Sequence, residues 1–153
     1  MADELQGPVF NIEKLYVKDL SVEVPNAPAI FMEHEAPKMD VNLSTESRAL
    51  AQDLFHTSIT VTVTAKAGDK TMFLVECTQA GVFRIQNVPA DQMSMVLGIG
   101  CPNIVFPYLR ETVSDVVTRA GFPPLLLNPV NFEALFMQQQ QAQQQQAAPA
   151  QTH

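Results

Sequence analysis

The apolar residues of this chain repeat at every second position up to about Pro89 and with a helical period after it. Alternation with a period of two is typical of strands with one buried face, and it occurs at residues 10–24, 39–43, 54–65 and 71–85. A short Gly-Asp turn between the third and fourth segments favours a hairpin. Strands that all precede the helices predict an α+β fold, a four-stranded antiparallel sheet with helices packed on one face. The second face of that sheet is expected to stay open.

The second part of the chain predicts helices. A short helix is expected over residues 91–97 and a long one over residues 102–120, where a proline suits the first turn and a glycine follows the end. Asn131 can cap a last helix that begins at the next residue. The glutamine-rich residues 138–153 have no apolar face and are expected to be disordered. The chain is therefore interpreted as one domain, residues 1–137, followed by a tail.

Charge and cysteine content exclude several classes of protein. Sixteen acidic residues against nine basic ones give a net charge of −7, which disfavours nucleic acid and anionic membranes as partners. Cys77 and Cys101 are too few for a disulfide framework and are expected to be reduced thiols. The N-terminus lacks the pattern of a signal peptide, and no apolar run approaches the roughly 20 residues that cross a bilayer. We expect a cytoplasmic protein without direct membrane insertion.

The reactive residue types do not form a recognisable catalytic or metal site. Asp19 and Glu23 share one face of a strand, but their Cα atoms are about 13 Å apart, wider than the roughly 5–9.5 Å of a glycosidase pair. They are interpreted as a solvated acidic face or a recognition patch. The three histidines lack zinc-ligand spacing, and no nucleophile elbow or phosphate-binding loop occurs. Cys101, just before a proline, is expected to be a buried and inert thiol. The sequence therefore predicts no enzyme, no metal and no cofactor.

A long apolar segment points to binding instead. Residues 122–136 combine phenylalanine and leucine with repeated prolines. So much apolar side chain, interrupted by prolines, is more than a small monomer can usually bury. The segment indicates a binding surface for other proteins.

Several motifs resemble one family. They are YVKD at residues 16–19, EVPNAP at 23–28, TVTA at 62–65, GCPNIVFPY at 100–108 and PVNFEALF at 129–136. In this order and spacing they are similar to the bacterial SecB family of protein-export chaperones. The resemblance covers roughly residues 8–137 and leaves out the glutamine-rich tail.

The resemblance implies a cytoplasmic homotetramer, a dimer of dimers with helices sandwiched between two outer sheets. Members hold preproteins unfolded in long apolar grooves, without a cofactor, and deliver them to the export ATPase SecA. The positions that contact SecA match Asp19, Glu23, Leu74 and Glu76. The positions linked to tetramer integrity match Val75, Cys77 and Gln79, which the alternation places on the opposite sheet face. The client groove is expected to involve the apolar loop and helix residues Phe31, Met32, Phe106, Leu125 and Phe136.

One departure and two alternatives accompany this interpretation. Relatives often carry a tryptophan in the loop over residues 31–37, whereas this chain has Glu35 there and no tryptophan at all. A first alternative is a SecB-like chaperone dedicated to a single partner, such as a toxin–antitoxin system. A second is a small enzyme, which turnover of some substrate would reveal.

Overall fold

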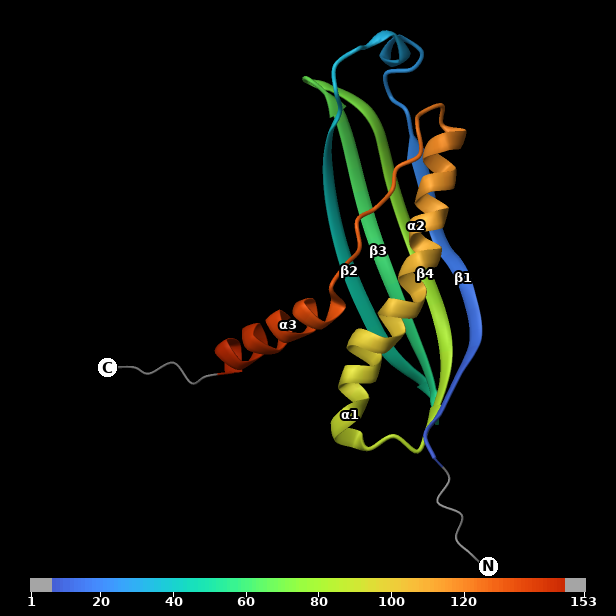
Figure 1. The fold of residues 1–153 in the computed structure, drawn as a ribbon, viewed down its shortest axis with the longest axis vertical. Coiled ribbons are helices and arrows are strands. Elements are labelled where there is room, and N and C mark those ends of the chain that lie inside the picture. The colour runs from blue at the N-terminus through green and yellow to red at the C-terminus, as the bar shows by residue number, and fades with distance from the viewer. Residues whose placement is uncertain (1–6, 148–153) are drawn as a thin grey trace, which may run out of the picture.

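The four strands form one antiparallel sheet in the computed structural model, which describes residues 7–147. The strands are β1 (Val9–Glu23), β2 (Lys38–Ala51), β3 (Leu54–Ala67) and β4 (Lys70–Gln86), in the spatial order β1-β4-β3-β2. β1 and β2 are therefore the two edges, and the segment between them crosses one end of the sheet with a 3₁₀ turn, Ala29–Met32 (Figure 1). The predicted α+β fold with a four-stranded antiparallel sheet is confirmed.

β2 is longer than its alternation predicts. The sequence indicates a strand at residues 39–43, but β2 pairs with β3 from Lys38, opposite Lys66, to Ala51, opposite Leu54. The extra length follows from the ladder, because β3 offers backbone hydrogen bonds even where the β2 side chains show no clear alternation. The hairpin between β3 and β4 is confirmed, and Gly68 takes its positive φ of 60° there.

Strict alternation is wrong for β1. Its register against β4 shifts between Ile12 and Lys14 and again between Val17 and Asp19. Each shift is a bulge that inserts one extra residue, so the side chains beyond it change parity. A single-sequence pattern of even and odd positions cannot show such insertions.

The two helices expected after Pro89 are joined into one helical run. α1 (Ala90–Met95) passes through a π-helical turn (Val96–Gly100) directly into α2 (Cys101–Arg119). A π turn disturbs the regular carbonyl pairing, and the Ser47 hydroxyl of β2 donates to the Leu97 carbonyl at 3.1 Å. The glycines of this turn are thus inside the helical run rather than in a linker.

The core lies between α2 and the inner face of the sheet. Val105, Leu109, Val113 and Val117 recur every four residues along α2 and are buried against β3 and β4. Tyr108 of the same helix is 49% exposed. α2 lies over one face of the sheet (Figure 1), and the outer face keeps many half-exposed side chains, as expected for an open face.

α3 (Phe132–Ala147) begins as predicted and projects away from the sheet (Figure 1). The Asn131 side-chain oxygen accepts a hydrogen bond from the Ala134 amide at 3.0 Å, which confirms the cap. The helix continues through the glutamine-rich residues that we expect to be disordered, and its side chains are exposed from residue 137 to residue 146. Residues 148–153 lie outside the described residues, and the division of the chain at residue 137 stays a prediction.

Candidate functional site

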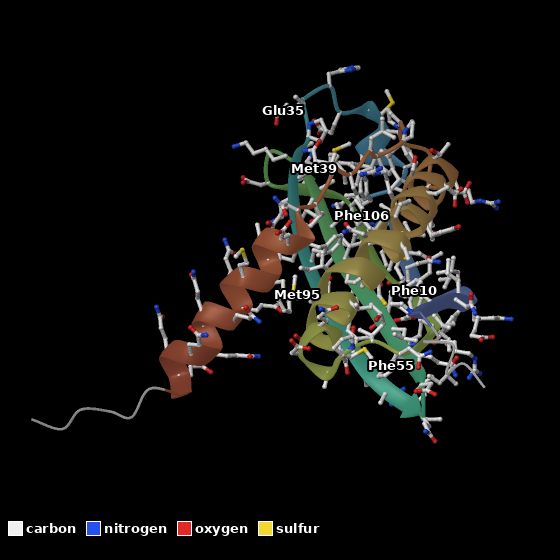
Figure 2. The ribbon with its side chains drawn as sticks, turned by 60° about the horizontal axis from the view of Figure 1, so that its bottom comes forward. Phe10, Glu35, Met39, Phe55, Met95 and Phe106 are labelled. Atoms are coloured by element: carbon white, nitrogen blue, oxygen red, sulfur yellow. The ribbon has the colours of Figure 1, made fainter. Side chains whose placement is uncertain are left out.

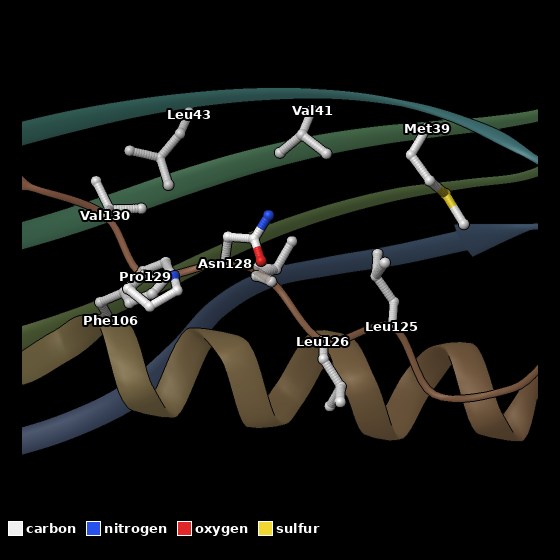
Figure 3. Close-up of a pocket in the computed structure, with 10 residues that line it drawn as sticks. Met39, Val41, Leu43, Phe106, Leu125, Leu126, Asn128, Pro129 and Val130 are labelled. Carbon is white, nitrogen blue, oxygen red and sulfur yellow. The ribbon is translucent and has the colours of Figure 1, made fainter.

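An apolar cavity of about 360 Å³ opens between β2 and the segment that connects α2 to α3. Figure 3 shows the β2 side chains facing this segment, with Phe106 of α2 beside it. Nearly all the lining residues are apolar: Met39, Val41, Leu43, Phe106, Leu125, Leu126, Leu127, Asn128, Pro129 and Val130. We call this cavity and its lining the apolar groove.

Arg110 of α2 holds the connecting segment in place. Its Nε donates to the Leu127 carbonyl at 3.0 Å, and its guanidinium lies 4.9 Å from the centre of the Phe106 ring. The Phe106 ring also packs edge-on against Phe132, with ring centres 5.7 Å apart. Leu127 is buried by this arrangement, whereas Leu126 is 71% exposed. The groove is therefore a fixed surface with exposed apolar side chains on its rim.

Only two of the five client residues expected from sequence line the apolar groove. Phe106 and Leu125 are there. Phe31 instead stacks against Phe122 at 5.2 Å between ring centres, and Met32 is 77% exposed on the 3₁₀ turn. Phe136 packs against Gly98 of the π-helical turn and lines a different cavity.

Sequence reasoning missed most of the groove. The alternation along the strand predicted that Met39, Val41 and Leu43 share one face. It did not predict which segment lies opposite that face. That segment has no period because prolines interrupt it, and its apolar content was the available signal. Glu35 lies at the tip of the molecule (Figure 2), with its carboxylate next to Gly68.

The acidic residues and Leu74 expected to contact SecA share the outer face of the sheet. Glu23 of β1 lies opposite Leu74 of β4, and Ser21 lies opposite Glu76. Asp19 lies opposite Thr78, whose hydroxyl bonds that of Thr60 on β3 at 2.9 Å. Directly opposed residues of an antiparallel pair point to the same face. Their side chains are thus grouped on the side of the sheet away from α2, and their role stays a prediction.

The sequence missed further acidic residues on this face, of which Asp40 is the one in register with Leu74. Asp40 of β2 lies opposite Thr64 of β3, which in turn lies opposite Leu74. The pairing partners of β2 were needed to find it.

The residues expected to support a tetramer are buried within the single chain. Val75, Cys77 and Gln79 are at most 4% exposed, beneath α2. The Thr112 hydroxyl of α2 donates to the Gln79 side-chain oxygen at 3.2 Å. These positions therefore contact α2 and do not themselves form an open surface.

Both cysteines are free and buried. Burial raises the pKa of the Cys77 thiol to about 11, with a further increase from the charge of Asp19. Burial also raises the pKa of Cys101 to about 11, against a smaller opposing effect of a hydrogen bond with Thr57. The expected burial of Cys101 is confirmed, and the raised pKa favours the protonated thiol at neutral pH, so its low reactivity stays a prediction.

An apolar stripe is left uncovered on β1. It lies on the face that α2 shares, because Ile12 is opposite Phe83, Leu20 opposite Cys77 and Val22 opposite Val75. Figure 2 shows Phe10 at this edge of the molecule. The members are 36–48% exposed, and we call them the β1 stripe: Phe10, Ile12, Val17, Leu20 and Val22. An apolar patch of this kind marks a surface for contact with another protein.

Residues 7–147 contain neither a grouped set of metal ligands nor a helix suited to span a membrane. No group of three or more His, Cys, Asp or Glu residues there is arranged to hold a metal ion. No described helix is both long enough and apolar enough to cross a bilayer.

Comparison with known proteins gives consistent matches. A family model described as preprotein translocase subunit SecB matches residues 3–144. The protein-export protein SecB of Thiobacillus denitrificans is 84% identical over 150 residues, which cover 98% of this chain and 99% of that protein. The SecB of Nitrosospira multiformis is 60% identical over 149 residues, 97% of this chain and 94% of that protein.

Among solved structures, a SecB-like chaperone of Mycobacterium tuberculosis, in complex with a peptide from an antitoxin, has a similar fold. The TM-score is 0.66 at 17% sequence identity, and the match covers 79% of this chain and 90% of that chain. At this identity the likeness concerns the fold.

Proposed function

The chain belongs to the SecB family of protein-export chaperones, and on that premise we propose that it holds unfolded preproteins in the apolar groove and delivers them to the ATPase SecA. The observation that carries the proposal is the groove itself, an apolar cavity of about 360 Å³ rimmed by exposed side chains. Unfolded chains expose the apolar side chains that such a surface can cover, and folded proteins hide them. The chaperone acts in the cytoplasm, without a cofactor and without catalysing a reaction.

Client binding derives its free energy from the burial of apolar surface. Covering one valine, leucine or phenylalanine side chain contributes about 1.5–3 kcal/mol. The groove borders β2, an edge strand whose outer backbone groups are free to bond an extended segment in a sequence-independent way. Together these contacts favour long unfolded segments and need no ATP.

Delivery to SecA uses the outer face of the sheet. This proposal is supported by the grouping of Asp19, Glu23, Leu74 and Glu76 on the face opposite α2. The charged residues steer a basic partner segment, and Leu74 supplies an apolar centre. Because the groove opens on the inner side of β2, client and SecA can be bound at the same time.

Assembly into a homotetramer, as a dimer of dimers, is supported by the β1 stripe. The side chains of the β1 stripe are too exposed for the chain to function as an isolated monomer. Val75, Cys77 and Gln79 then influence assembly through the position of α2. Replacing Leu20 of the stripe by lysine should dissociate the tetramer, whereas Ser21→Lys, one residue along on the outer face, should leave it intact. Sedimentation velocity separates these outcomes, and a wild-type monomer at micromolar concentration would contradict the proposal.

The chaperone activity is tested by the refolding of a slow-folding preprotein without ATP. Wild-type protein should delay refolding, and Val41→Asp, which puts a charge into the apolar groove, should abolish most of the delay. Asn42→Asp is the matched control, because it adds the same charge to the next residue of β2, on the outer face. Equal effects of the two substitutions, or no delay by the wild-type protein, would contradict the proposed groove.

The alternative of a chaperone dedicated to a single partner has less support. The mycobacterial protein bound to an antitoxin peptide is 17% identical to this chain, whereas the Thiobacillus protein-export protein is 84% identical. Pull-downs from cells distinguish the two, since an export chaperone should retain many preproteins and a dedicated one a single partner.

A further inference from the structure

Tyr16 and His56 form a partly buried polar link across the outer face of the sheet. The Tyr16 hydroxyl lies 2.7 Å from Nε2 of His56, and the two ring centres are 5.9 Å apart. His56 is only 6% exposed. Tyr16 is opposite Ala80, and His56 is opposite Val82, so the link passes over β4 and joins β1 to β3. The small side chain of Ala80 leaves room for this contact.

The link lies in the part of β1 where the register is least secured. The two bulges of β1 enclose the stretch from Lys14 to Val17, with Tyr16 inside it. A strand that slips by one residue turns all its side chains to the other face. Asp19 follows immediately after the second bulge and Glu23 lies four residues further on, so their outward direction depends on the register of this stretch.

We infer that the Tyr16–His56 hydrogen bond fixes the register of β1 between its two bulges and so positions Asp19 and Glu23 for SecA. Tyr16 and His56 are positioning residues, because they act on the partner through the two carboxylates. This inference rests on the proposed function of the outer face. It extends that function by making the presentation of the acidic residues dependent on the protonation of His56.

The charges around His56 decide the direction of this dependence. Lys18 of β1 and Arg48 of β2 are close to the ring, Lys14 lies in the same cross-strand row, and Glu46 of β2 is the acid that acts against them. β4 contributes the apolar Ala80 and Val82 to this row, and its Arg84, one row away, is paired with Glu13 of β1 at 2.8 Å. Burial lowers the pKa of His56, and the charges of Lys18 and Arg48 lower it further, against the smaller opposite effect of Glu46.

Folding therefore favours the neutral ring, which is paired through Nε2 with the Tyr16 hydroxyl. The pKa of His56 is lower in the folded protein than its unfolded value of about 6.5, so the folded state binds this proton less readily than the unfolded state. The stability that the neutral ring contributes is therefore complete above about pH 6.5 and is lost as the pH falls through the folded-state pKa. A charged ring can only donate from Nε2 to the Tyr16 oxygen, and it is repelled by Lys18 and Arg48. β1 should loosen in mild acid.

Amide hydrogen exchange of the full-length protein tests the link without any partner. Tyr16→Phe keeps the ring and removes only the hydroxyl. It should raise exchange in β1 by about five- to tenfold relative to β3, the effect of losing one side-chain hydrogen bond. Unchanged exchange in β1 would overturn the inference.

Calorimetric titration with SecA between pH 8 and pH 5.5 tests the consequence. Wild-type affinity should fall below about pH 6.5, and His56→Gln, which keeps a neutral polar group, should remove this fall while keeping the affinity at pH 8. His34→Gln is the control, since it alters an exposed histidine of a loop and should behave as wild type. The same fall in His56→Gln as in wild type would overturn the inference. Absence of SecA binding at every pH would contradict the proposed function instead, and exchange in β1 would then decide the inference.

Discussion

Leu126 offers the most direct measure of how the apolar groove binds clients. It lies on the rim of the groove and is 71% exposed, so its truncation changes the client surface more than the core. Leu126→Ala removes three carbon atoms, which is about 2.4 kcal/mol of burial at about 0.8 kcal/mol per methylene group. Scaled by the exposed fraction, a client that covers this side chain loses about 1.7 kcal/mol. The dissociation constant should rise roughly 15-fold.

The assay is the equilibrium binding of a fluorescently labelled, unfolded preprotein to the wild-type protein and to each variant. Leu50→Ala is the matched control, because it makes the same truncation at a leucine of β2 that is 43% exposed and does not line the groove. Thermal unfolding should be nearly unchanged in both variants. Salt should affect the wild-type affinity little, since the contact is apolar. An affinity for Leu126→Ala equal to that of wild type, or to that of Leu50→Ala, would refute the assignment of the groove.

Three further predictions concern the rest of the molecule. Reversing Asp19 and Glu76 to lysine should weaken SecA binding roughly tenfold, by lost attraction and new repulsion, and should leave client holding unchanged. The affinity of the wild-type protein for SecA should also fall with added salt. Calorimetry that finds the same SecA affinity in the double variant as in wild type would contradict the role of the acidic face. Thr112→Val leaves the buried side-chain oxygen of Gln79 without its donor. The substitution should destabilise the packing of α2 by about 1–3 kcal/mol, which urea unfolding measures. It should also lower the fraction of tetramer, which sedimentation measures. Burial raises the pKa of the Cys101 thiol from 9.0 to about 11. This thiol should therefore react about 100-fold more slowly with an alkylating reagent than an unperturbed thiol does. Rapid alkylation of Cys101 in the native protein would show that this thiol is not buried.

Much of the outer face followed from the sequence because its pattern is local. Alternation along one strand sets which side chains share a face, and it grouped Asp19 with Glu23 and Leu74 with Glu76. That these two strands are neighbours came from the structure, since β1 and β4 are far apart in the chain. The bulges that bring Asp19 into line with Thr78 have no signal in a single sequence.

The apolar groove could be predicted only in part. The sequence marked residues 122–136 as a binding segment, and Phe106 and Leu125 do line the groove. Phe31 and Phe136 have the same apolar character, but they pack against Phe122 and Gly98, because aromatic side chains take whichever apolar neighbours the fold brings near. Composition therefore indicated that a binding surface exists, and not which residues form it.

The sequence by itself determined the kind of each element, the order of strands before helices, and local features such as the Asn131 cap and the turn at Gly68. These depend on residues a few positions apart, whose spacing decides how a backbone can bond and turn. The tertiary structure alone decided the opposition of β2 and residues 125–130 across the groove, and the exposure of the β1 stripe. These depend on which distant segments pack together, because a side chain is buried or open only with respect to neighbours that the chain brings to it from elsewhere.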